Sequence, residues 1–297
     1  MKTLITLYQS QSMDDLSPYV DGFIIGHQAF GTRLTHSFSA VEIKNMIDTA
    51  RKLNKEIFLM GNQMMTDDHL DHFVAWLSEF SIDSFHGIVC ADLGVVKKLS
   101  DLGWADKLIY NPETLMTNFY DFNFFNRLNI QGVYVAKEIT LEDIKKIGQE
   151  KTLKLFMVGH GHLNMFYSKR QLIKNYADYI EIPEEFHESQ NLRLVEETRA
   201  GIEYPILEDY AGTHVFRANV FSALYHLDEL EPLVDYFVID TLFKSDAYGK
   251  IVAQGYHEKN NQIKEYVEQT YHETWDEGFF FKKTIYKGKT SESWLNY

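Results

Sequence analysis

A regular alternation of short apolar runs with amphipathic segments constrains this chain more than any other feature of its first 158 residues. Seven runs have the length and apolar character of buried strands, and five of the segments between them have helical periodicity. The strand candidates are 2–7, 22–26, 56–61, 87–91, 107–110, 131–136 and 153–158. The helix candidates are 39–53, 66–79, 93–102, 114–128 and 140–149. This order predicts an α/β fold with a parallel sheet and right-handed crossovers.

An eighth unit decides the architecture. The apolar run 235–240 is followed by the helical segment 246–258, which brings the number of strands to eight. Eight such units in 297 residues predict a TIM-like (β/α)8 barrel, a fold that typically takes about 250 residues. A doubly wound open sheet is the alternative. No GxGxxG turn follows the first strand, which argues against a dinucleotide-binding sheet.

Residues 168–219 break this rhythm. An acidic segment, 181–188, precedes alternating runs at 192–196, 204–207 and 213–216. We therefore expect an insertion of antiparallel strands before the last barrel strand. The predicted organisation is a barrel over 1–259, with the insertion at about 168–219, followed by a C-terminal helix and tail over 260–297.

Composition excludes several classes of protein. A hydrophobic content of 45% supplies a large core, which excludes a disordered chain. The formal charge of −14 makes the chain a poor binder of nucleic acid on its own. No apolar run approaches the roughly 18 residues of a membrane helix, and the first residues lack the features of a secretion signal. With a single cysteine, Cys90, these features predict a cytoplasmic protein without membrane association.

In a barrel of this kind, the functional residues lie at the carboxyl ends of the strands. Polar residues at or just beyond the predicted strands are therefore candidates for substrate binding. Arg33 and Arg217 suit an anionic ligand, because the planar guanidinium group can bind a carboxylate or phosphate through two hydrogen bonds. The candidate substrate-binding residues are Arg33, Asn62, Asp92, Asn111, Arg217 and Asp240.

Three further residues are candidates for catalysis: Lys137, Glu138 and His160. Lys137 and Glu138 could form an ion pair tuned for proton transfer, or a pair that only braces two loops. His160 and His162, separated by one glycine, could bind a divalent metal with Glu138 as a third ligand. Alternatively, His160 is a hydrogen-bonded histidine that fixes the loop. Cys90 lies inside an apolar run, which favours an inert thiol over a nucleophile.

Five segments, taken in order, resemble the peptidase U32 (collagenase-like protease) family, a hydrolase family by name. The resemblance extends over about residues 4–257 and implies a barrel fold, in agreement with the count of strands. The matching segments are Phe30–Arg33 with Phe38 and Ser39, Val89–Val95, Ala136–Ile144, Gly159–Arg170 and Tyr236–Asp240.

The chain departs from the family at two positions. Asn164 and Gln171 stand where the family signature has cysteines that help to hold an iron–sulfur cluster in its oxygen-independent hydroxylases. With Cys90 as its one cysteine, this chain cannot build such a site alone. No cofactor is therefore assigned to the chain and no iron–sulfur cluster is expected, while a divalent metal at His160 and His162 stays open.

The missing cysteines and the segment Leu108–Asn118 resemble the shorter of two paralogous chains of this family that act in tRNA modification. This resemblance implies a non-cluster subunit in prephenate-dependent 5-hydroxylation of the tRNA wobble uridine. It also implies a longer, cysteine-bearing paralog as partner, contact with tRNA through the complex, and a small carboxylate such as prephenate at the barrel mouth. A collagenase-like peptidase, metal-assisted through His160, His162 and Glu138, and a catalytically inactive barrel scaffold are the alternatives.

Overall fold

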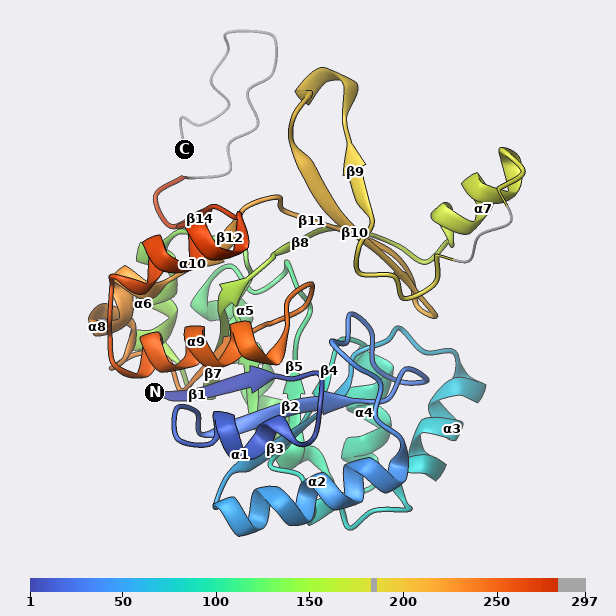
Figure 1. Ribbon diagram of the computed structural model, residues 1–297. Coiled ribbons are helices and arrows are strands. Elements are labelled where there is room, and N and C mark those ends of the chain that lie inside the picture. Colours follow the sequence, from blue (N-terminus) through green and yellow to red (C-terminus); the bar gives the residue numbers. More distant parts are fainter. Residues whose placement is uncertain (183–185, 283–297) are drawn as a thin grey trace, which may run out of the picture.

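The computed structural model describes residues 1–182 and 186–282. Within these residues, eight parallel strands close into a barrel (Figure 1), because β13 pairs with both β7 and β1. The closed barrel confirms the predicted architecture and excludes the open sheet. The barrel strands are β1 (Lys2–Thr6), β2 (Gly22–Gly26), β3 (Glu56–Gly61), β4 (Gly87–Cys90), β5 (Leu108–Tyr110), β6 (Gly132–Tyr134), β7 (Lys154–Gly161) and β13 (Tyr236–Ile239).

Helices follow the strands and cover the outside of the barrel (Figure 1). Ser39 starts α2 with a capping box: its hydroxyl accepts from Glu42 N (3.3 Å), and the Glu42 carboxylate accepts from Ser39 N (2.8 Å). Thr140 caps α6 by accepting from Asp143 N (3.2 Å). The outer helices are α1 (Ser12–Leu16), α2 (Ala40–Leu53), α3 (Asp67–Leu77), α4 (Leu93–Asp101), α5 (Phe119–Phe124), α6 (Leu141–Glu150) and α9 (Asp246–His257).

A second, antiparallel sheet is inserted between β7 and β13 and projects from one end of the barrel (Figure 1). In the described part of the chain it contains four strands in the order β8-β11-β10-β9. The sheet consists of β8 (Asn164–Ser168), β9 (Arg193–Val195), β10 (Glu203–Asp209) and β11 (Gly212–Phe216), with α7 (Leu172–Tyr179) beside it. The sheet begins a few residues before the predicted insertion, because β8 continues almost directly from β7.

The C-terminal segment returns to the barrel. Strand β14 (Trp275–Asp276) pairs with β12 (Val220–Ser222), which is antiparallel to β7. Two helices, α8 (Leu227–Leu230) and α10 (Ile263–Tyr271), complete this region. Residues 183–185 of the acidic segment and 283–297 of the predicted tail lie outside the described residues. None of the helices in the described residues is long and apolar enough to cross a membrane.

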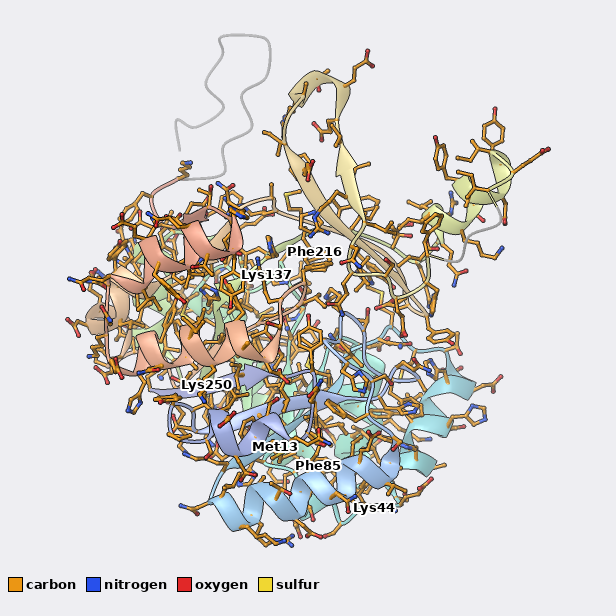
Figure 2. All side chains as sticks on the ribbon, viewed as in Figure 1. Met13, Lys44, Phe85, Lys137, Phe216 and Lys250 are labelled. Atoms are coloured by element: carbon orange, nitrogen blue, oxygen red, sulfur yellow. The ribbon has the colours of Figure 1, made fainter. Side chains whose placement is uncertain are left out.

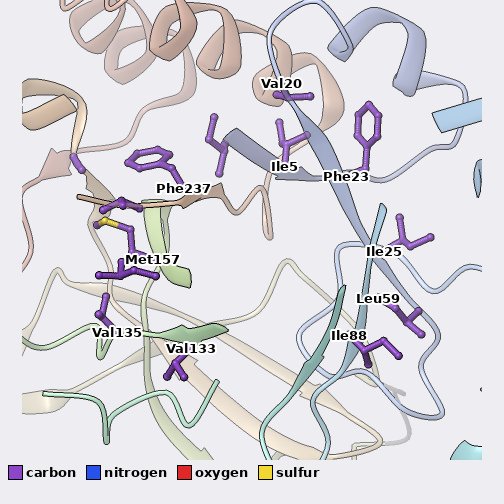
Figure 3. Close-up of a cluster of buried hydrophobic side chains, with 14 of the residues drawn as sticks. Ile5, Val20, Phe23, Ile25, Leu59, Ile88, Val133, Val135, Met157 and Phe237 are labelled. Carbon is purple, nitrogen blue, oxygen red and sulfur yellow. The ribbon is translucent and has the colours of Figure 1, made fainter. Parts of the chain in front are cut away.

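Two apolar layers fill the fold, because successive side chains of a strand point to opposite faces. The outer layer packs between strands and helices; Figure 3 shows part of it, including Ile5, Phe23 and Phe237. The inner layer fills the barrel, where the rings of Phe156 and Tyr236 stack 4.4 Å apart. A ligand must therefore bind at one end of the barrel.

Gly159 in β7 gives a prediction for this packing. A Cβ atom at this position would lie 1.9 Å from Cζ of Phe237, a ring that is fully buried. We expect Gly159→Ala to lower the free energy of unfolding by about 1–3 kcal/mol, because the ring has little room to move. Denaturant unfolding measures the change. Gly249→Ala in α9, where the nearest atom is 3.1 Å away, is the control; equal stability of the two variants would contradict the prediction.

Candidate functional site

The carboxyl ends of the barrel strands enclose a small cavity of about 60 Å³, which we call the mouth cavity. Its floor consists of apolar residues, Ile24, Met60, Val158 and Val238, together with Tyr134. Four of the predicted site residues line it: Arg33, Asn111, Lys137 and Asp240. Figure 2 shows Lys137 on the side of the barrel that faces the insertion. The volume suffices for a few water molecules or one small polar group of a ligand.

Glu113 connects the two cations of the mouth cavity. Arg33 Nη2 donates to Glu113 Oε1 at 2.6 Å, and Lys137 Nζ donates to Glu113 Oε2. The three side chains are 12–21% exposed. Burial alone would raise the pKa of Glu113, but the charges of Arg33 and Lys137 outweigh it and lower the pKa to about 2. Glu113 is therefore ionised and bridges two cations from different loops.

The backbone around Arg33 is fixed from two sides. Asn62 Oδ1 accepts from Thr32 N at 2.9 Å, and Asp209 Oδ2 accepts from Arg33 N at 2.9 Å. Arg33 has a φ of +56°, a conformation that needs such support in a residue other than glycine. Because Asp209 belongs to β10, the antiparallel insertion positions this arginine at the barrel mouth.

Asp240 and Tyr134 add polar groups to the same cavity. The Asp240 carboxylate accepts from Leu242 N (3.1 Å) and Thr6 Oγ1 (3.4 Å), and burial raises its pKa. Tyr134 is 5% exposed, and burial raises the pKa of its phenol, which stays neutral and can donate. The cavity therefore presents two cations, a neutral phenol and two acidic side chains.

A larger pocket of about 550 Å³ lies next to the mouth cavity, between the loop after β2 and residues 188–191 of the insertion. The two spaces share Leu34, Thr35 and His36 as a common wall. Gln190 supports this wall: its Nε2 donates to Thr35 O (3.0 Å), and its Oε1 accepts from Tyr8 OH (2.6 Å). The mouth cavity and this pocket are therefore neighbours on either side of the loop after β2.

His160 is fully buried away from the mouth cavity, between two tyrosines. Its Nε2 lies 2.8 Å from the Tyr248 hydroxyl, and its Nδ1 lies 3.2 Å from the Tyr256 hydroxyl. Tyr248 donates its own proton to Glu273, so it accepts from His160 Nε2. Both ring nitrogens are therefore used within the fold, as in the loop-fixing alternative.

The remaining parts of the predicted metal site do not come together. His162 Nδ1 donates to the carbonyl of Arg217 at 2.9 Å, while Glu138 is exposed. The described residues contain no group of three His, Cys, Asp or Glu side chains arranged to hold a metal ion. Lys137 pairs with Glu113 in place of its neighbour Glu138.

Three other candidates are held in contacts outside the mouth cavity. Asn62 supports Thr32, as described above. Asp92 caps α4, where its Oδ1 accepts from Gly94 N at 2.6 Å. Arg217 Nη2 donates to Asp276 Oδ2 at 2.6 Å. The arrangement of these side chains indicates structural roles.

Glu113 and Tyr134 were not predicted from the sequence. Glu113 lies two residues beyond Asn111, and the proline between them marks a turn that keeps the chain at the mouth. This proline was the available signal. Tyr134 lies within β6, where its ring packs in the inner core and its side chain also borders the mouth cavity. The sequence pattern therefore does not distinguish it from an ordinary core aromatic.

The buried His160 and the half-buried His162 predict that stability falls as the pH drops below about 6.5. Burial, assisted by the charge of Lys244, lowers the pKa of His160 well below its ordinary value and that of His162 to about 3. In the unfolded chain both protonate at about pH 6.5, so acid favours unfolding. Between pH 7.5 and 5.5 we expect His162 to account for up to about 1.4 kcal/mol of the loss. Denaturant unfolding of His162→Gln should show a correspondingly smaller loss; an unchanged pH dependence would contradict this.

The insertion also carries an apolar groove of about 690 Å³ between α7 and the antiparallel sheet. Several large side chains in it are exposed, among them Phe166 (47%), Tyr176 (62%) and Leu194 (41%). Exposed apolar surfaces of this kind are typical of contacts with other molecules.

Comparison of the sequence with known proteins identifies its family. The model of peptidase family U32 matches residues 14–290. The tRNA hydroxylation protein P2 of Bacillus subtilis (strain 168) is 28% identical over 314 residues, which cover 96% of this chain and 100% of that protein. The tRNA hydroxylation protein P1 of the same organism is 20% identical over 157 residues, 52% of this chain and 37% of P1.

One further relative and one solved structure carry the name of protease or peptidase. An uncharacterized protease of Methanocaldococcus jannaschii, MJ0090, is 20% identical over 83% of this chain and 64% of that protein. The solved structure of the U32 peptidase Mk0906 aligns with a TM-score of 0.50 at 14% identity, over 81% of this chain and 92% of that one. At this identity the likeness to Mk0906 establishes the fold alone.

Proposed function

The chain belongs to peptidase family U32, and within this family we propose that it is the non-cluster subunit of a system that hydroxylates the wobble uridine of tRNA at C5 with the help of prephenate. The sequence similarity that supports this proposal spans the whole of a relative named for tRNA hydroxylation. The proposal requires the protein to work in the cytoplasm, where tRNA is modified.

The observation that carries the proposal is the pair of cations at the barrel mouth. Arg33 and Lys137 converge on the carboxylate of Glu113, and a ligand carboxylate at the same position would form the same two ion pairs. Tyr134 and Asp240 lie below it as further polar contacts. Prephenate, a small dicarboxylate, offers a carboxylate to this pair of cations.

This chain's residues do not fit an iron–sulfur cluster. Cys90 is buried in β4, where burial raises the pKa of its thiol, and Asn164 and Gln171 cannot supply thiolates. Asn164 instead donates to the carbonyls of Phe166 and Val215 within the antiparallel sheet. We therefore assign the cluster to a longer, cysteine-bearing paralog, which would also bring the acidic chain into contact with tRNA.

A paralog partner has two supports. The relatives of this chain include both P1 and P2, two tRNA hydroxylation proteins of one organism. The exposed apolar groove of the insertion is of the kind that protein contacts bury. We expect the two chains to co-purify when they are expressed together, with iron bound to the longer chain.

Peptide hydrolysis receives less support from the geometry. A peptidase needs an activated nucleophile or a metal-bound water. His160 has both ring nitrogens engaged by tyrosines, and the described residues offer no three-ligand metal group. Hydrolysis of casein or gelatin by the purified chain, lost in His160→Ala, would favour the peptidase.

The proposal is tested by mass spectrometry of the tRNA nucleosides from cells with and without this gene. We expect loss of 5-hydroxyuridine and its derivatives in the deletion strain, with recovery when the wild-type gene is returned. Other modified nucleosides in the same digest serve as the internal control. Unchanged 5-hydroxyuridine derivatives, in a strain without a second copy of the gene, would overturn the proposal.

A further inference from the structure

We propose that Glu113 occupies the position of the ligand carboxylate and is displaced when a small dicarboxylate binds. This inference rests on the proposed function, because it concerns the same mouth cavity. It assigns to Glu113 control over which ligands enter and how tightly they bind.

Three loops bring the relevant charges together. Arg33 follows β2, Glu113 follows β5 and Lys137 follows β6. Each carboxylate oxygen of Glu113 pairs with one cation: Oε1 accepts from Arg33, and Oε2 accepts from Lys137. A free carboxylate ligand would be held in the same way, since its two oxygens can accept from two donors at once.

Glu113 is suited to leave this position. Within the described residues, its carboxylate has no hydrogen-bond partner besides these two cations. Its side chain is 21% exposed, so it lies at the boundary between cavity and solvent. Its backbone has a φ of +67° and is held by Asn111 Oδ1, which accepts from Glu113 N at 3.1 Å. The side chain can therefore swing out while the loop keeps its anchor.

The size of the cavity leads to the same conclusion. The cavity volume of about 60 Å³ is enough for a few water molecules. A dicarboxylate with a carbon ring requires more space than this. A ligand of that size has to take over space at the rim, where the carboxylate of Glu113 now lies. The exchange keeps both buried cations paired, whereas entry beside Glu113 would bring two carboxylates together.

An internal competitor weakens the apparent affinity of the ligand, because only the fraction of molecules with Glu113 displaced can bind. Removing the charge of Glu113 abolishes the competition. We expect Glu113→Gln to lower the Kd for prephenate at least tenfold. Glu113→Asp keeps the charge balance, but its side chain is one methylene shorter and cannot reach both cations as well, so we expect a smaller decrease.

The test is isothermal titration calorimetry of the purified full-length chain with prephenate. Wild type, Glu113→Gln, Glu113→Asp and the exposed control Glu150→Gln are compared after thermal melts have established that each is folded. Tighter binding by both Glu113 variants, with the control unchanged, supports the displacement. If Glu113→Gln does not fold, Glu113→Asp alone decides.

The possible failures can be distinguished. Binding to wild type that stays equal or weakens in the Glu113 variants overturns the displacement and leaves the carboxylate site intact. Absence of binding to wild type and to both variants overturns the carboxylate site of the proposed function as well. The nucleoside analysis of the deletion strain tests the role in tRNA hydroxylation independently of either result.

Discussion

Cells that carry Lys137→Met in place of the wild-type chain are expected to lose the proposed tRNA hydroxylation, with 5-hydroxyuridine reduced at least thirtyfold. The reason is that Lys137 is one of two cations at a largely buried carboxylate position. Truncating one partner of such a pair costs about 2–5 kcal/mol, which corresponds to a factor of roughly 30 or more in binding. Arg33→Met is expected to have the same effect through the other cation.

The matched control is Lys146→Met. Lys146 lies on α6, close in sequence to Lys137, and its exposed side chain pairs with Glu142 one turn away. Surface pairs of this type contribute little, so hydroxylation should be unchanged in the control. The measurement is mass spectrometry of nucleosides from complemented deletion strains, with the amount of each variant protein determined by immunoblot. Normal 5-hydroxyuridine in Lys137→Met cells would contradict the assignment of the mouth cavity.

The second large effect concerns stability. Glu273→Ala is expected to lower the free energy of unfolding by about 3–5 kcal/mol, because it leaves the largely buried cation of Lys244 unpaired. The same carboxylate also accepts from Tyr248 OH (2.7 Å) and Trp275 Nε1 (2.5 Å). For a chain of this size, the loss corresponds to a decrease in Tm of roughly 5–8 °C.

Differential scanning fluorimetry and denaturant unfolding measure this change. Glu265→Ala on α10 is the control, since Glu265 is exposed and, among the residues that the structure describes, accepts only from Gln269, four residues away. A loss below about 1 kcal/mol in Glu273→Ala would contradict the prediction.

The barrel could be predicted from the sequence because its strands are buried on both faces. Such strands are short continuous apolar runs, and Gly22–Gly26 and Gly87–Cys90 are recognisable without knowledge of their neighbours. The start of the insertion was less accessible. Asn164–Ser168 is half-exposed and follows β7 after two residues, so its pattern does not separate it from the barrel.

The candidate site could be predicted only in part, because a polar residue after a strand has several possible partners. Arg33, Asn111, Lys137 and Asp240 line the mouth cavity as the strand-end rule predicts. Asp92 obeys the same rule but turns back to cap its own helix. The ion pair between Lys137 and Glu113 joins residues 24 positions apart, and no local spacing predicts such a contact.

His160 illustrates a different limit of sequence reasoning. The spacing of His160 and His162 is compatible with metal binding. The two tyrosines that contact His160, however, come from α9, 88 and 96 residues further along the chain. Because both ring nitrogens of His160 contact these phenols, the histidine is part of a buried hydrogen-bond network and does not act as a metal ligand. The glycine before it has a packing role, because Phe237 leaves no room for a side chain at Gly159.

The insertion supports the loop that carries Arg33, although it lies far from this loop in the sequence. Asp209 accepts from Arg33 N and from Thr32 Oγ1 (2.7 Å), and Gln190 supports Thr35. The loop after β2 is therefore held between the barrel and the insertion.

The most direct test of the central claim is reconstitution in an extract from cells that lack both this chain and the longer paralog. Unmodified tRNA and prephenate are supplied, and each purified chain is added alone or together with the other before 5-hydroxyuridine is measured. The account predicts hydroxylation only when both chains are present. Full hydroxylation by the longer paralog alone would contradict it, because this chain would then have no necessary part in the reaction.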